Sequence, residues 1–418
     1  MGLTLSRDGW LLFASCGVRS FAYGFLSVIL GLYLDAIGLS PAAIGWIFTA
    51  ALAGSAVMTV IITSIADRFG RKTLLILGAV LMALAGWTFA VNDNPILLAI
   101  AAVFGTISPS GKDVGPFLSI EQAILPQTTG DQRRTAVFSA YNLVGSFAGA
   151  VGALAVGLPV FFSFSPAAGY RFLIWSYVGS AILLVFLFAR LSPGVEAEKT
   201  AESSTRNVGV KKSRAIVAKL AGLFALDAFA GGFIVQSIVA YWFYLRYNTD
   251  LSALGGIFFG TNLLAALSFL AAPAFARRFG LLNTMVFTHL PSNVLLLLVP
   301  LMPNVELTVT ILLIRHLLSQ MDVPTRQSYT MAVVDPDERA ASAGILSVAR
   351  NAGAAAAPLF TGAILAVPSL GVPFLLAGGL KIVYDLWIFG VFRHVKPPEE
   401  KNLRFAIPPS SSTRLSDK

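Results

Sequence analysis

The chain of 418 residues is 56% hydrophobic and only 12% charged, which is about half the charged fraction of an ordinary soluble protein. This composition argues against a soluble globular enzyme. Twelve membrane helices of about 20 residues each need roughly 240 mostly apolar residues, and the hydrophobic part of the chain is of that size. The single cysteine, Cys16, allows no intramolecular disulfide and no thiolate metal cluster.

Twelve apolar segments of spanning length follow one another along the chain. Polar turns, or turns marked by glycine and proline, separate them. The predicted spans lie near residues 10–35, 41–66, 73–91, 95–125, 135–160, 169–189, 217–245, 251–276, 282–301, 306–333, 341–367 and 371–392.

Lys and Arg are distributed unequally between the two sets of loops that these spans create. If the N-terminus is cytoplasmic, twenty-two of the thirty lie in inner loops and tails, and only Arg171 and Arg246 lie in outer loops. This bias predicts a multi-pass protein of the cell membrane with both termini in the cytoplasm. The net charge of +9 follows from this topology, so no nucleic-acid partner is expected.

The two halves of the chain repeat each other at a nearly constant offset. Sliding the chain by 209 or 210 residues places residues 45–48 over 255–258, residues 66–70 over 276–280, and Asp113 over Asp322. These matches fall at equivalent spans of each half, which indicates a duplication.

The longest polar stretch lies between the two halves and has no apolar period, so it is expected to be a flexible cytoplasmic linker. We predict an all-α integral membrane protein with 12 transmembrane helices, arranged as two six-helix bundles. The predicted parts are an N-terminal bundle at 1–190, the linker at 191–216, a C-terminal bundle at 217–393 and a cytoplasmic tail at 394–418.

The inner loop after the second span reads Asp67-Arg68-Phe69-Gly70-Arg71-Lys72. In a duplicated chain of twelve spans, this loop resembles the signature of the major facilitator superfamily, Gly-x-x-x-Asp-Arg-x-Gly-Arg-Arg/Lys. One departure is Thr63, where the family prefers glycine, and the second copy of the motif is degenerate. The stretch from Met321 to Arg339 is similar to a little-characterised prokaryotic branch of that superfamily. The resemblance implies bundles related by a pseudo-twofold axis and transport by alternating access.

Asp67, Arg68, Arg71 and Lys72 are candidates for a cytoplasmic gate. Asp67 is one residue from Arg68 and four from Arg71, so several charges can pair across the ends of neighbouring helices. The resemblance implies that the acid contacts the other half and favours the outward-facing state. The alternative is that the loop only sets the topology.

Eleven charged residues fall inside the predicted spans. A charge at mid-bilayer costs roughly 2.5–3.5 kcal/mol and needs a partner or a wet cavity. Lys381 and Asp385 are four residues apart and are expected to pair with each other. The other nine are candidates for the substrate or proton pathway: Arg19, Lys112, Asp113, Glu121, Asp227, Arg315, Asp322, Arg326 and Arg350.

Two spans carry signals of a broken helix. The fourth contains two prolines and two glycines between Ser108 and Pro116, and the tenth contains Asp322-Val323-Pro324. Interrupted spans at matching positions of two halves indicate the binding site of a transporter. Asp113 and Asp322 therefore either line this site or cap the second part of each broken helix.

Buried carboxylates are natural carriers for protons, since burial favours their protonated form and nearby cations favour their ionised form. Asp227, Asp113 and Asp322 are the candidates, with Glu121 as a relay, whereas His289 and His316 are expected to be hydrogen-bonded packing. Arg315, Asp322 and Arg326 share one helix face. Arg19 and Asp227 either pair across the pathway in one state or pair separately within their own halves.

No group of residues has the spacing of a metal site, a phosphate loop or a nucleophilic triad, so we expect no enzyme activity, cofactor or metal. The sequence favours a secondary active transporter, a monomer in the lipid bilayer, that moves a small charged or amphiphilic solute and is coupled to protons. The alternatives are a proton-independent facilitator or exchanger, and a membrane sensor that keeps the fold without transport.

Overall fold

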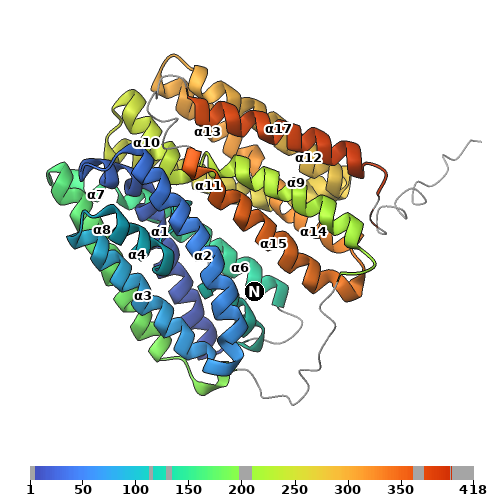
Figure 1. Cartoon of the computed structure of the whole chain (residues 1–418), viewed down its shortest axis with the longest axis horizontal. Coiled ribbons are helices and arrows are strands. Elements are labelled where there is room, and N and C mark those ends of the chain that lie inside the picture. The colour runs from blue at the N-terminus through green and yellow to red at the C-terminus, as the bar shows by residue number, and fades with distance from the viewer. Residues whose placement is uncertain are drawn as a thin grey trace, which may run out of the picture.

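The structure is a computed structural model that describes residues 5–112, 116–128, 134–196, 210–360, 371–395 and 397, except for the side chains of residues 63, 67, 134–136, 336 and 340. Within these residues the chain forms helices and no strands. Figure 1 shows two bundles, one made by the blue to green half of the chain and the other by the yellow to red half.

The N-terminal bundle begins with three long helices, and its later helices are shorter or divided. It contains α1 (Arg7–Ala36), α2 (Pro41–Phe69), α3 (Arg71–Val91), α4 (Pro95–Phe104), α5 (Pro116–Ile124), α6 (Arg134–Ala155), α7 (Leu158–Phe161) and α8 (Pro166–Ala189), with 3-10 turns at Leu125–Thr128 and Pro193–Val195.

The C-terminal bundle follows the same plan. It contains α9 (Arg214–Gly232), α10 (Gln236–Tyr247), α11 (Leu251–Phe279), α12 (Leu281–Leu298), α13 (Val305–Ser319), α14 (Asp322–Val333), α15 (Arg339–Ala356) and α17 (Val372–Phe392), with 3-10 turns at Val299–Leu301 and Pro336–Glu338.

Local signals explain where several of these helices begin. Proline occupies the start of α2, α4 and α8, where its missing N–H costs nothing. The Ser40 hydroxyl accepts a hydrogen bond from the backbone N–H of Ala43, and the Asp250 carboxylate accepts one from Ala253 at 2.7 Å. These caps satisfy N–H groups that have no partner inside the helix.

The two ends of the molecule differ in charge. We call one end the basic end: it holds the α2–α3 turn at Gly70 and the α11–α12 turn at Gly280, next to Arg68, Arg71, Arg277 and Arg278. We call the opposite end, with the turns at 37–40 and 248–250, the far end. Gly70 and Gly280 have φ of 90° and 87°, a region that favours glycine. They are 210 residues apart, so the duplication predicted from the sequence recurs in the backbone.

Nine helices or helix pairs among the described residues are long and apolar enough to cross a membrane. The fourth and tenth predicted spans are each divided into two short helices. The eleventh predicted span contains α15, and its residues 361–367 lie outside the described residues. The predicted all-α membrane fold of twelve spans is confirmed.

The two predicted helix breaks are present. The fourth span leaves helical geometry after Phe104 and resumes at Pro116, and the tenth leaves it after Ser319 and resumes at Asp322. Pro324 lies in the first turn of α14, where it lacks the N–H that would continue the helical hydrogen bonds.

A third break, in the seventh span, was not predicted from the sequence. α9 ends at Gly232 and α10 starts at Gln236. The freed backbone N–H of Ser237 donates to the carbonyl of Pro109 at 3.0 Å, which joins the seventh span to the broken fourth span of the other bundle. The pair Gly231-Gly232 was the available signal, since glycine weakens a helix interior.

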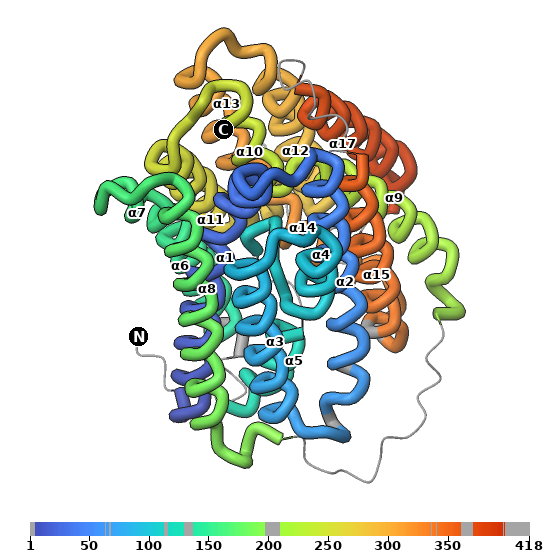
Figure 2. Tube along the Cα trace, turned by 60° about the vertical axis from the view of Figure 1, so that its left-hand side comes forward, coloured from blue at the N-terminus to red at the C-terminus, as the bar shows by residue number. Residues whose placement is uncertain are grey.

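The two bundles meet at the far end. The Ser237 hydroxyl donates to the Ser27 carbonyl at 2.6 Å, and the Tyr241 hydroxyl donates to Asp35 at 2.7 Å. A cluster of buried apolar side chains runs through the N-terminal bundle and continues into α10 and α11. At the basic end, no hydrogen bond or ion pair between described residues joins the bundles, although α2 and α15 run side by side (Figures 1 and 2). The structure is therefore closed at the far end.

Glycines let α1 and α6 pack closely within the N-terminal bundle. A Cβ on Gly152 would lie 2.1 Å from the carbonyl oxygen of Phe21, and a Cβ on Gly24 would lie 2.2 Å from that of Gly149. Small residues at such crossings are the usual means of bringing membrane helices together.

We expect Gly152→Ala to lower the free energy of unfolding by about 1–3 kcal/mol, since the added methyl group must push two backbones apart. The measurement is thermal unfolding in detergent. Gly179→Ala is the matched control, because a Cβ there meets nothing within 4 Å, and it should be neutral or stabilising. Equal unfolding midpoints for the two variants would contradict the close packing.

Candidate functional site

Arg19 of α1 and Glu121 of α5 form a bidentate ion pair inside the N-terminal bundle. Nη1 donates to Oε1 at 3.0 Å and Nη2 donates to Oε2 at 2.6 Å, and both side chains are 0% exposed. Tyr141 of α6 donates to Oε2, and Ser15 donates to Oε1 at 2.7 Å. We call these four residues the Arg19 cluster. It carries no net charge, and all its charged atoms have partners, as burial in a membrane requires.

Asp227 of α9 is the centre of a second cluster, in the C-terminal bundle. Its Oδ1 accepts from Lys381 of α17 at 2.5 Å, and its Oδ2 accepts from Arg326 of α14 at 3.1 Å and from Arg350 of α15 at 3.2 Å. One buried carboxylate thus connects four helices. Together with Asp322, we call these residues the Asp227 cluster.

Asp322 and Arg326 pair along one face of α14, as their spacing predicts. Oδ2 of Asp322 accepts from Nη1 of Arg326 at 2.9 Å, so this guanidinium group is shared between two carboxylates. α14 has no side-chain cap, which excludes the alternative that Asp322 serves as one here. Arg315 of α13 is also buried, at 7% exposure, and acts electrostatically on Asp322 and Asp227.

The breaks in the fourth and tenth spans face each other. Nζ of Lys112, in the loop after α4, donates to the side-chain carbonyl of Gln320 at 3.4 Å, and Gln320 lies between α13 and α14. Asp113 lies outside the described residues, so its predicted role stays a prediction. The matched breaks therefore place a lysine of one bundle beside the charged cluster of the other.

In this structure Arg19 and Asp227 are paired separately, which is one of the two alternatives predicted from the sequence, and they do not pair with each other. Arg19 is occupied by Glu121, and Asp227 by cations of its own bundle. The reason is proximity: the counter-ions of each residue lie on neighbouring helices of its own bundle, so neither residue needs a partner across the interface.

The predicted pair of Lys381 with Asp385 is wrong. Lys381 contacts Asp227, whereas Asp385 binds Nδ1 of His289 at 2.8 Å and accepts from Asn293 at 2.8 Å. Helical spacing allows the first pair, but both side chains have closer partners on neighbouring helices. His289 is hydrogen-bonded within the core, and Nδ1 of His316 lies 2.7 Å from the Leu312 carbonyl oxygen.

Tyr141, Gln320 and Asn293 complete these networks and were missed from the sequence. Polar uncharged residues are common in membrane helices, and no spacing singled these three out. Among the described residues, no group of three or more His, Cys, Asp and Glu side chains is placed to hold a metal ion.

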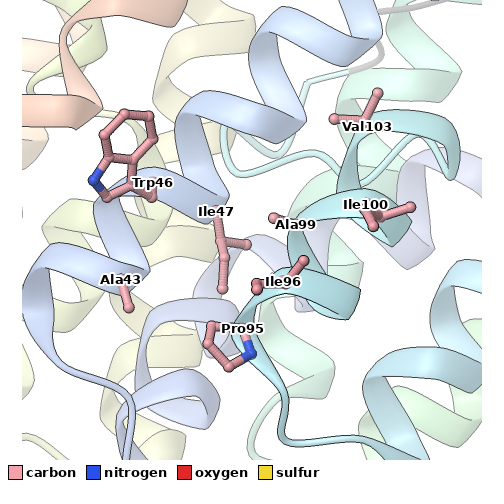
Figure 3. Close-up of a pocket in the computed structure, with 8 residues that line it drawn as sticks. All are labelled: Ala43, Trp46, Ile47, Pro95, Ile96, Ala99, Ile100 and Val103. Atoms are coloured by element: carbon pink, nitrogen blue, oxygen red, sulfur yellow. The ribbon is translucent and has the colours of Figure 1, made fainter.

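An apolar groove at the far end of the N-terminal bundle lies away from the charged residues. It is formed by α2 and α4, has a volume of about 390 Å³ and is lined by Trp46, Ile96 and other apolar side chains (Figure 3). Trp46 is 64% exposed, so the groove faces outward from the bundle. No charged residue lines it, so it is not the site of the embedded charges.

Comparison with known proteins identifies the family. The family model of the Major Facilitator Superfamily matches residues 12–319, about three quarters of the chain. The chain belongs to the major facilitator superfamily. The uncharacterized membrane protein YJR124C of Saccharomyces cerevisiae is 27% identical over 435 residues, covering 95% of this chain and 97% of the yeast protein. The similarity therefore extends beyond prokaryotes.

Solved transporters share the fold. The nucleoside transporter NupG superposes with a TM-score of 0.73 at 14% identity, covering 93% of this chain and all of NupG. The D-xylose-proton symporter superposes with a TM-score of 0.68 at 15% identity, covering 94% of this chain and 98% of the symporter. The predicted superfamily and fold are confirmed.

The superfamily's loop signature lies at the basic end. Gly70 makes the turn, and the carboxylate of Glu196 accepts from the backbone N–H groups of Arg71 at 2.6 Å and Lys72 at 3.2 Å. Nζ of Lys72 donates to the carbonyl of Leu191 at 2.7 Å. The start of the predicted linker thus caps α3. Arg68 is exposed beside the ring of Phe69, and the side chain of Asp67 lies outside the described residues.

Glu338 makes the corresponding contact in the C-terminal bundle. Its carboxylate accepts from the backbone N–H groups of Lys211, Lys212 and Ser213 at 2.6–2.8 Å. Burial alone raises the pKa of Glu338, but these donors outweigh it and lower the pKa to about 2. The two ends of the predicted linker are therefore each fixed by one glutamate to a bundle.

We expect Glu121→Gln to destabilise the protein by about 3–5 kcal/mol, since Arg19 would keep a buried charge without its counter-ion. Thermal unfolding in detergent measures the effect. The double variant Arg19→Met with Glu121→Leu removes both charges and should recover most of the loss. If the double variant is less stable than Glu121→Gln alone, the cluster is not the self-contained pair described above.

Proposed function

We propose that this protein is a secondary active transporter that carries a small charged or amphiphilic solute across the cell membrane by alternating access, driven by protons. The observation that supports this most is the division of the embedded charges into two clusters, one in each bundle. The ion pairs of each cluster join residues of a single bundle. The bundles can therefore tilt against each other without breaking a buried ion pair.

With the basic end in the cytoplasm, as the charge bias predicts, closure at the far end corresponds to an inward-facing state. Opening the far end requires Ser237 to leave Ser27 and Pro109, and Tyr241 to leave Asp35. Each such hydrogen bond contributes on the order of 1 kcal/mol net. A small number of them is compatible with two states that differ by a few kcal/mol, as alternation needs.

Asp227 is the residue we propose for proton coupling. Protonation of its carboxylate would weaken its contacts with Lys381, Arg326 and Arg350 at once. Arg350 lies on α15, which packs against α2 of the other bundle. A proton on Asp227 can therefore act on the contact between the bundles. A proton-independent facilitator or exchanger would keep these ion pairs throughout its cycle.

The test uses a cysteine that reports the opening of the far end. Ser237 is 0% exposed and belongs to the far-end contacts, and Cys16→Ser gives a background without cysteine, so Ser237→Cys carries the one thiol. The loss of the Ser237 hydroxyl is common to all variants compared. We expect the rate of its labelling from the far side to change with pH in this background. Asp227→Asn should remove the pH dependence, and Asp93→Asn, at an exposed turn, should keep it.

Full pH dependence in Asp227→Asn would contradict the coupling role of Asp227.

The same reporter tests the gate that Asp67 is proposed to form. If Asp67 favours the outward-facing state, Asp67→Asn should lower labelling of Ser237→Cys from the far side, whereas Asp337→Asn, whose side chain is 88% exposed at the basic end, should not. Unchanged labelling in Asp67→Asn would leave that loop a role in topology alone.

A further inference from the structure

We propose that the solute is an anion, and that Arg315, Arg350 and Lys112 hold its carboxylate or phosphate group beside the Asp227 cluster. This inference rests on the transport function proposed above and names the class of its substrate. It follows from a difference among the cations of this region: some form close ion pairs with carboxylates, and others have few partners or none.

Arg315 is the least satisfied of them. It is 7% exposed, its Nε is buried without a hydrogen-bond acceptor, and it forms no hydrogen bond or ion pair with any residue that the structure describes. Its charge nevertheless interacts electrostatically with Asp322 and Asp227, so it lies near the cluster. A buried guanidinium N–H without an acceptor is unfavourable, and an anion bound there would supply one.

Two further cations have one side-chain partner each among the described residues. Arg350 makes a single contact with Asp227, at 3.2 Å, and its side chain is 33% exposed. Lys112 is exposed, and among the described residues its ammonium group has only the side-chain carbonyl of Gln320 as a partner, at 3.4 Å. By contrast, Arg326 binds two carboxylates and Lys381 binds Asp227 at 2.5 Å. The three available cations come from both bundles: Lys112 and Arg315 lie in the broken fourth and tenth spans, and Arg350 lies on α15.

The local charge also favours an anion. Five cations face three carboxylates among the described residues: Lys112, Arg315, Arg326, Arg350 and Lys381 against Asp227, Asp322 and Asp385. If Asp113 were a fourth carboxylate, the cations would still be in excess. Guanidinium groups bind carboxylate and phosphate through two parallel hydrogen bonds, so two arginines and a lysine suit either group.

The same geometry links the anion to the proton. Arg350 now contacts Asp227, and an anion that binds Arg350 competes with that carboxylate for the same cation. Binding of the anion and protonation of Asp227 then support each other. The arrangement fits entry of an anion together with a proton.

The test compares two thiol reagents of opposite charge at one position. Gln320→Cys in the Cys16→Ser background places a thiol at the break between α13 and α14, at the residue that contacts Lys112. We expect the anionic sulfonatoethyl methanethiosulfonate to react about tenfold faster than the cationic trimethylammonioethyl reagent, relative to the same ratio at the exposed Thr73→Cys. Both reagents attack the same thiolate, so the ionisation of the thiol cancels in the ratio.

Arg315→Gln should reduce this preference to about threefold or less, and Arg315→Lys should keep most of it. Arg171→Gln, which removes an exposed arginine at the far end, should leave it unchanged. Equal rates, a faster cationic reagent, or no effect of Arg315→Gln would overturn the proposal. Failure of both reagents to react would show a site closed to solutes, and would overturn it as well. Labelling of Ser237→Cys does not depend on the solute's charge, so alternating access would stand or fall separately.

Discussion

The cost of a charge in the membrane interior is the constraint on which this structure depends. A charge without a partner is expensive there, so every embedded charge must find a counter-ion, a hydrogen bond or a wet surface. Arg19 finds Glu121 within its bundle, and Asp227 gathers three cations within the other. The charges that remain only partly satisfied, led by Arg315, mark where something from outside the protein is expected to bind.

This separation of the charges has a mechanical consequence. The contact between the bundles at the far end consists of neutral hydrogen bonds, one hydroxyl–carboxylate bond and close packing at glycine, such as Gly255 against the carbonyl oxygens of α6. Contacts of this kind are individually weak and can be exchanged for water at modest cost. A buried ion pair across the same interface would have locked it.

Much of the fold could be predicted from sequence, because it depends on local signals. Apolar length predicts the spans, the offset of 210 residues predicts the duplication, and Pro324 predicts the break before α14. Partners of the charges were harder to predict. The spacing of Lys381 and Asp385 predicts a pair on one helix, yet both turn to neighbouring helices, because helix rotation and packing are set by the whole bundle. Among the side chains that the structure describes, Asp322 and Arg326 have the partners that helical spacing indicates.

The central claim is that the two bundles move as units about the contact at the far end. Spin labels at Thr73 and Asn283 report the basic end, and labels at Asp93 and Pro303 report the far end; all four residues are exposed, and each pair is related by the 210-residue repeat. Pulsed electron resonance should show, as pH is lowered in lipid, that the distance at one end shortens while the other lengthens. Distances that change in the same direction at both ends, or at neither, would contradict the account.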